Sequence, residues 1–194
     1  MALCLVGSEM CIRDSLWYGE ASSSLTIMNE MQDRSSIPIL FDADIEYGLH
    51  QRFPKGTDLL PLMAIAATSN PNNAYDIGKV IAKESRSVGI HWNFSPVVDV
   101  NNNPANPIIN VRSFSEDPDM VIDYGIQFMK GLQDHGMLAT AKHFPGHGDT
   151  ETDSHSSLAM ISSDSLRLWS LEIPPFQSMI NSGVDAVMVG HIHA

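Results

Sequence analysis

The sequence predicts an α/β fold of the (β/α)8 TIM-type barrel class, with about four βα units present. Helix-period segments alternate with short, continuously apolar segments over residues 22–189, which is typical of a parallel sheet covered on both sides. Each apolar segment ends in polar residues, as barrels require at the carboxyl ends of their strands. No repeat or low-complexity linker interrupts residues 16–194, so one incomplete barrel domain is expected.

The individual elements follow from periodicity and end signals. Helices are expected at 22–31, 73–87, 117–135 and 163–181, and strands at 37–41, 90–98, 138–144 and 184–189. The third helix opens at Asp117-Pro118 and should bury a stripe of Val121, Tyr124, Phe128 and Leu132. A doubly wound open sheet is the alternative. The barrel is favoured because all four strands deliver polar groups at one end, whereas an open sheet concentrates them at one switch point.

Composition narrows the classes of function. A formal net charge of -12 opposes binding to nucleic acid or to anionic membrane surfaces. The longest apolar stretch, 59–67, falls well short of the roughly 20 residues that a bilayer span needs. Both cysteines lie in the first eleven residues, so a disulfide framework is not expected. We expect no cofactor, no membrane span and no nucleic-acid partner.

The first 15 residues resemble neither a secretory signal nor a folded element. They lack a basic start and a small-residue cleavage site, and they resemble translated sequencing adapter. We expect 1–15 to be a non-native segment, and the compartment cannot be read from it.

The segment 142–155 carries the most chemistry. Lys142 and His143 end a predicted strand, where an ammonium and an imidazole can donate hydrogen bonds to the hydroxyls of a neutral ligand. A Pro-Gly-His-Gly turn follows and allows close approach of the backbone to a ligand. Asp153 and His155 are two residues apart, so in an extended backbone both point the same way. A carboxylate beside an imidazole suits a group that is first a general acid and then a base.

This segment, Lys-His-Phe-Pro-Gly-His-Gly-Asp followed by Asp-Ser-His, closely resembles the signature loop of glycoside hydrolase family 3, in its beta-N-acetylhexosaminidase branch. Three other blocks match the family in order: 44–53 with Asp-Ile-Glu-Tyr-Gly and Arg-Phe, 95–101, and 112–118. The resemblance covers nearly all of 37–194. Tyr47 departs from the family pattern, which has glycine there.

The resemblance implies the site residues and the reaction. Asp153 and His155 would form the acid/base pair. The residues that would hold the sugar are Asp44, Arg52, Arg112, Lys142 and His143. The implied reaction is retaining hydrolysis of terminal beta-linked N-acetylglucosamine from peptidoglycan-derived or chitin-derived fragments. Its aspartate nucleophile follows a later strand in the family, and no residue here is assigned to it.

Each residue also has a plainer interpretation. Asp44 could cap a turn, Lys142 and His143 could be a solvated pair, and Arg112 could pair with Glu116 or Asp117. Asp99 is expected to order the Asn-rich loop and is left outside the site.

Three other functions stay open. A metal-dependent amidohydrolase-like barrel would use histidines such as His191 and His193, although its His-x-His usually follows the first strand. A beta-glucosidase of the same family would share the sugar-holding residues. An inactive partial barrel would expose unpaired strand edges.

Overall fold

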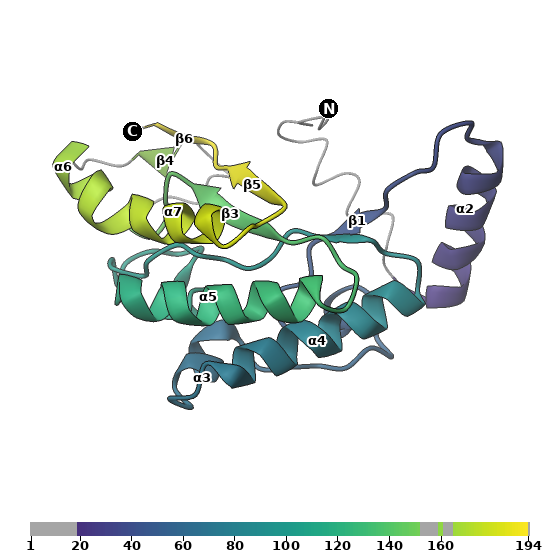
Figure 1. Cartoon of the computed structure of the whole chain (residues 1–194), viewed down its shortest axis with the longest axis horizontal. Coiled ribbons are helices and arrows are strands. Elements are labelled where there is room, and N and C mark those ends of the chain that lie inside the picture. The colour runs from purple at the N-terminus through teal and green to yellow at the C-terminus, as the bar shows by residue number, and fades with distance from the viewer. Residues whose placement is uncertain (1–18, 152–158, 161–164, 194) are drawn as a thin grey trace.

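A computed structural model describes residues 19–151, 159–160 and 165–193 of the chain. Its longer helices are α2 (Ala21–Arg34), α4 (Asn72–Ser87), α5 (Pro118–Gln133) and α7 (Ile173–Asn181). Shorter helical elements are η1 (Leu49–Gln51), α3 (Leu62–Ala66), η2 (Asn110–Arg112), α6 (Ser165–Arg167) and the π-helical turn η3 (Leu168–Glu172). Figure 1 shows α4, α5 and α7 stacked along the strands, with α2 standing apart at one end.

The strands form a parallel row in chain order. β1 (Asp42–Ala43) pairs with β2 (Trp92–Asn93), and β3 (Thr140–Phe144) pairs with β5 (Ala186–Val189). Single parallel bridges from Trp92 to Leu138 and from Val97 to Lys142 join β2 to β3. A separate parallel pair is formed by β4 (Ala159–Met160) and β6 (Ile192–His193). Parallel strands that alternate with helices agree with the predicted partial barrel.

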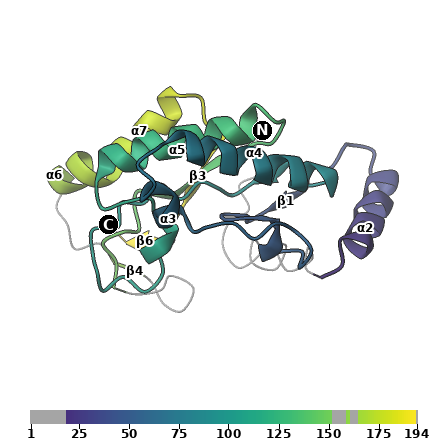
Figure 2. The ribbon, with the colours of Figure 1, turned by 90° about the horizontal axis from the view of Figure 1, so that it is seen from below.

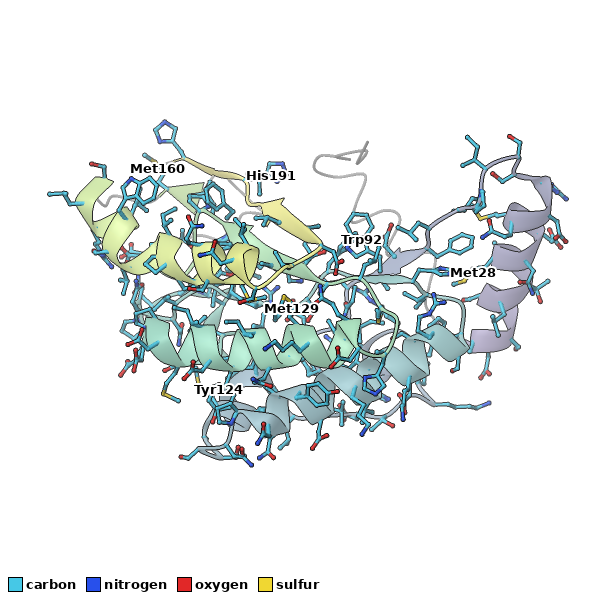
Figure 3. The ribbon with its side chains drawn as sticks, viewed as in Figure 1. Met28, Trp92, Tyr124, Met129, Met160 and His191 are labelled. Atoms are coloured by element: carbon cyan, nitrogen blue, oxygen red, sulfur yellow. The ribbon has the colours of Figure 1, made fainter. Side chains whose placement is uncertain are left out.

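Most of the core lies between the helices and this row. The predicted stripe of α5 is buried in full, and the Tyr124 hydroxyl donates to the Ala66 carbonyl of α3 (3.1 Å). Figure 3 labels Tyr124 on the side of α5 that is nearer to α3 and Met129 on the side nearer to the strands. Helix α5 therefore packs on two sides, and its sequence is apolar on both.

Helices α4 and α5 touch backbone to backbone, and Figure 2 shows them side by side from below. A Cβ added to Gly78 would lie 2.3 Å from the Phe128 carbonyl oxygen, and one added to Gly131 would lie 2.2 Å from that of Tyr75. Glycine is thus required on both sides of the contact.

The expected elements are present with shifted bounds. The strand expected at 37–41 is found at Asp42–Ala43, because Ile37 and Leu40 are exposed and reach no neighbour strand. The continuous helix expected at 163–181 is instead α6, the π turn η3 and α7. Pro174 and Pro175 lack the N–H groups that a regular helix needs there, which accounts for the break. Within the described part of the chain, no helix is long and apolar enough to span a bilayer.

The glycine contact between the helices is testable. Gly→Ala in a helix interior ordinarily stabilises a protein by roughly 0.5–1 kcal/mol. We expect Gly78→Ala to lower the free energy of unfolding instead, by about 1–3 kcal/mol, because the new methyl meets backbone. Urea denaturation measures this, with the exposed Lys130→Ala of α5 as control; a stabilised Gly78→Ala protein would contradict the contact.

Candidate active site

A buried lysine connects the ends of two strands. Lys142, from β3, places Nζ 2.6 Å from Asp44 Oδ1 and 2.7 Å from Glu46 Oε1, both of which follow β1. Burial alone would lower the pKa of Lys142, but the two carboxylates outweigh it and raise that pKa above its ordinary value. Lys142 is therefore a charged ammonium that holds two acids together.

Arg112 completes this cluster from η2. It grips Glu46 with two hydrogen bonds, Nε to Oε2 (2.9 Å) and Nη2 to Oε1 (2.7 Å), and its Nη1 donates to the Ile108 carbonyl. Lys142 and Arg112 hold the pKa of Glu46 well below its ordinary value, against the opposing effect of burial. The partner of Arg112 is thus Glu46, and neither Glu116 nor Asp117 takes that place.

The turn that presents Asp44 and Glu46 is fixed by side chains from elsewhere. Asn93, fully buried in β2, accepts from the Ile45 N–H (2.9 Å) and donates to its carbonyl (2.8 Å). Arg52 donates through Nε to the Asp44 carbonyl (2.8 Å). Tyr47 stands where the family has glycine, but the position that needs glycine is Gly48, which has φ +119° and packs on the Thr57 carbonyl.

Asp99 forms a second anchor. Its Oδ2 lies 2.7 Å from His143 Nδ1, and its Oδ1 accepts the backbone N–H groups of His143 (3.2 Å) and His147 (2.7 Å). Because a carboxylate only accepts, Nδ1 of His143 carries a proton, and Nε2 is the ring nitrogen left for a ligand. His143 and these bonds lower the pKa of Asp99 although burial opposes this. Asp99 therefore orders the 143–147 segment and not, as expected, the Asn-rich loop: its carboxylate is bonded to His143 and His147, and its carbonyl accepts from Ser113, beyond that loop.

The lowered pKa values of Glu46 and Asp99 make the stability of the fold depend on pH. Glu46 and Asp99 have ordinary values of 4.5 and 3.8. Since their folded-state pKa values lie below these, each acid contributes stability to the fold that is fully present above its ordinary value and is lost as the pH falls from that value toward the lower folded-state pKa.

The turn after β3 is packed against the loop that follows β2. Asn106 donates through Nδ2 to the carbonyls of His147 (2.7 Å) and Gly148 (3.0 Å). A Cβ on Gly148 would collide with the Val100 carbonyl oxygen, at 1.7 Å. The second glycine of the Pro-Gly-His-Gly turn is therefore a contact requirement.

The cluster has a buried floor and an accessible rim. The side chains of Lys142 and Glu46 are 1% and 4% exposed, whereas those of Asp44, Arg112 and His143 are 30%, 21% and 17% exposed. A carboxylate, a guanidinium and an imidazole at one rim can accept from and donate to the hydroxyls of a sugar. The floor holds the rim in place.

The structure thus brings three of the seven predicted site residues, Asp44, Arg112 and Lys142, into one ion-pair cluster around Glu46. His143 follows Lys142 directly and is bonded to Asp99, and Arg52 lies against the backbone of Asp44. Asp153 and His155 lie outside the described residues. Sequence reasoning missed Glu46, Asn93, Asn106 and the anchoring role of Asp99. Only Glu46 carried a signal, since it stands two residues after Asp44 and shares its face in an extended backbone.

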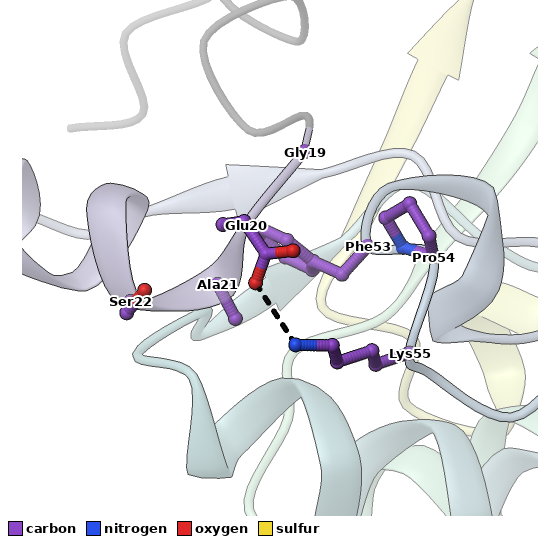
Figure 4. Close-up of a pocket in the computed structure, with 7 residues that line it drawn as sticks. All are labelled: Gly19, Glu20, Ala21, Ser22, Phe53, Pro54 and Lys55. Carbon is purple, nitrogen blue, oxygen red and sulfur yellow. Dashed lines mark hydrogen bonds and ion pairs between the residues drawn. The ribbon is translucent and has the colours of Figure 1, made fainter.

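A metal site and a separate hollow are the two other kinds of site to consider. Among residues 19–151, 159–160 and 165–193, no group of three or more His, Cys, Asp or Glu is placed to hold a metal ion. A hollow beside the start of α2, shown in Figure 4, is lined by 19–22 and 53–55, and its Lys55–Glu20 pair (3.2 Å) is exposed.

The buried lysine is testable by charge removal. Lys142→Met keeps the stem and leaves two acids without their ammonium, so we expect the free energy of unfolding to fall by about 3–5 kcal/mol. Chemical denaturation at neutral pH measures it. Lys83→Met, on the exposed face of α4, should change stability by less than about 1 kcal/mol; equal effects of the two substitutions would rule out the ion-pair cluster as a major support.

Comparison with known proteins identifies the family. The model of the glycosyl hydrolase family 3 N terminal domain matches residues 14–194. Curated relatives include a beta-N-acetylglucosaminidase/beta-glucosidase of Cellulomonas fimi, 36% identical over 89% of this chain and 30% of its own length. A beta-hexosaminidase of Stenotrophomonas maltophilia is 38% identical over 80% of this chain and 48% of its own length.

Solved structures agree. A family 3 beta-N-acetylglucosaminidase from Paenibacillus is similar with a TM-score of 0.84 and 35% identity, over 96% of this chain and 39% of that one. NagZ from Neisseria gonorrhoeae, in complex with N-trifluoroacetyl-D-glucosamine, has a TM-score of 0.79 and 32% identity, over 88% of this chain and 53% of that one. The chain spans about half or less of the length of these relatives. With the fold, the ordered blocks and the family model in agreement, the chain belongs to glycoside hydrolase family 3.

Proposed function

We propose that this chain is the sugar-binding and acid/base part of a beta-N-acetylhexosaminidase that removes terminal beta-linked N-acetylglucosamine with retention. The proposal rests on one observation: Asp44, Arg112 and His143 are partly exposed and Lys142 is buried, at the strand ends of a family 3 barrel. The Asp-x-His pair follows this rim in sequence. Relatives named beta-hexosaminidase and beta-N-acetylglucosaminidase support the amino-sugar substrate.

The proposed reaction has two displacements. In the first, His155 gives its proton to the bridging oxygen while a carboxylate attacks the anomeric carbon, so the glycosidic C–O bond breaks as the glycosyl–enzyme bond forms. In the second, the neutral imidazole takes a proton from water, which attacks the same carbon and frees the carboxylate. Asp153 would orient the imidazole and favour its charged form.

We propose that the nucleophilic aspartate lies outside the 194 residues and that the chain alone does not turn over substrate. Two observations support this. The chain spans between 28% and 53% of the length of eight curated relatives. The outer strands of the parallel row also have exposed apolar residues: Leu40, just before β1, is 45% exposed and Val189, in β5, is 65% exposed. Apolar side chains at a strand edge are the expected surface for further barrel units.

The specificity within the family is also a proposal. N-acetylglucosaminides from peptidoglycan or chitin are the favoured substrates because the Asp-x-His pair is typical of that branch. A beta-glucosidase activity is the second candidate, since one relative is named for both.

The first test is an assay on aryl glycosides. We expect the 194-residue chain to release no nitrophenol from 4-nitrophenyl N-acetyl-beta-D-glucosaminide above background, because the nucleophile is missing. A protein extended to the length of its relatives should hydrolyse it, and should prefer it over the glucoside. Ordinary enzymatic turnover by the short chain would contradict the placement of the nucleophile, and a preference for the glucoside would contradict the substrate.

The second test addresses the acid/base role. In the complete enzyme, His155→Ala should lower kcat by roughly 10²–10⁴-fold on substrates with poor leaving groups, because a general acid contributes about that much. The loss should be much smaller on 2,4-dinitrophenyl glycosides, whose leaving group needs no proton. The control is His135→Ala, in the turn before β3 and at the opposite end of that strand from His143; the His135 ring bonds the Gly131 carbonyl. Equal losses on both substrates would refute the acid role of His155.

A further inference from the structure

Glu172 is a buried acid for which the proposed reaction has no use. It ends the π turn η3, and its residue is 1% exposed. One carboxylate oxygen, Oε1, accepts from Asn102 Nδ2 (2.8 Å). The other, Oε2, is buried and has no hydrogen-bond partner among the residues that the structure describes. An ionised carboxylate with one oxygen unpaired is costly to bury, whereas a neutral acid costs much less.

Glu172 supports the turn that follows Lys142 and His143. Gly146 in this turn has φ +137°, and a Cβ added there would lie 2.7 Å from Glu172 Oε2 and 2.8 Å from Glu172 Cβ. The Gly146 N–H closes the turn on the His143 carbonyl (2.8 Å). The backbone of the turn therefore rests directly on the Glu172 side chain.

Two other side chains hold the same turn from other elements. Asp99 accepts the His147 N–H (2.7 Å), and Asn106 donates to the His147 carbonyl (2.7 Å). Phe144, at the end of β3, also packs edge-on against Phe176 of α7 (5.4 Å between centroids), and its carbonyl accepts the Gly190 N–H (2.8 Å). Among these described supports, Glu172 is the one with an unpaired ionisable oxygen against the backbone.

The charges around Glu172 favour its neutral form. Burial raises its pKa to about 7, and Asp99 and Asp149 add to the shift. The Asn102 hydrogen bond and Arg167 oppose it; Arg167 is itself held by Asp149 (2.8 Å). Because the folded-state pKa lies above the ordinary 4.5, the stability that Glu172 contributes is complete below that value and is lost as the pH rises through about 7.

We propose that Glu172 is a positioning residue of the active site: its neutral side chain holds the backbone of the turn 144–148 in place, and its ionisation lets this turn move away from it. This proposal rests on the proposed function in one respect: in sequence, the turn 144–148 links the sugar-holding Lys142 and His143 to the acid/base residues Asp153 and His155. Glu172 touches neither substrate nor reacting atoms in this scheme. It acts through the backbone of Gly146.

Hydrogen exchange of the 194-residue chain tests the seating without any need for turnover. After correction for intrinsic rates, the protection of amides 146–150 should fall by about 30-fold between about pH 5.5 and about pH 8, as part of the roughly 300-fold that a shift from 4.5 to about 7 allows over the whole pH range. Amides of α4 should show no such fall. Glu172→Gln keeps the shape without the charge and should remove the pH dependence of 146–150; the exposed Glu116→Gln is the matched control.

Two results would overturn the proposal: no loss of protection in the wild-type chain, or the same loss in Glu172→Gln. Gly146→Ala provides a second variant, because its methyl would displace the turn and should lower protection at both pH values. In the complete enzyme, the ratio of kcat at about pH 8 to kcat at about pH 5.5 should be higher for Glu172→Gln than for the wild type. If the exchange behaviour is as expected but the complete enzyme has no glycosidase activity, the proposed function is wrong and the role of Glu172 still stands.

Discussion

The rest of the site depends on the ion pairs that Lys142 makes with Asp44 and Glu46. A single ammonium, with almost no exposure, satisfies acids that follow a different strand 98 residues earlier. Without it, the buried carboxylate of Glu46 would face the like charge of Asp44 with only Arg112 to offset the two acids, which proteins rarely tolerate. Strand pairing and charge pairing are therefore mutually dependent: β3 must lie where it does for β1 to end in two carboxylates.

Much of the fold could be predicted because its signals are local. The apolar stripe of α5 and its opening at Asp117-Pro118 depend on residues close in sequence, and the structure has both. The parallel arrangement followed from the alternation of helix and strand periods. What failed were bounds that depend on partners, as at the first strand, and on backbone hydrogen bonding, as at the proline pair of α7.

The site was predictable only where residue chemistry and family resemblance coincide. Lys142, His143 and Asp44 stand at strand ends and are recognised by position. Glu46, Asn93 and Asn106 act through contacts with residues 66, 48 and 41 positions away, which no local pattern encodes. Asp99 was read as a loop residue because its partners, two backbone N–H groups and an imidazole, become neighbours only when β2 and β3 lie side by side.

The glycine contact between α4 and α5 also limits how the molecule can respond to damage. Where side chains separate two helices, losing a core methyl group lets the helices draw together and partly refill the space. Here backbone already meets backbone at Gly78 and Gly131, so no further approach is possible. A void opened beneath them, for instance at Phe128, would stay empty, and its energetic penalty should fall at the upper end of what such truncations cost.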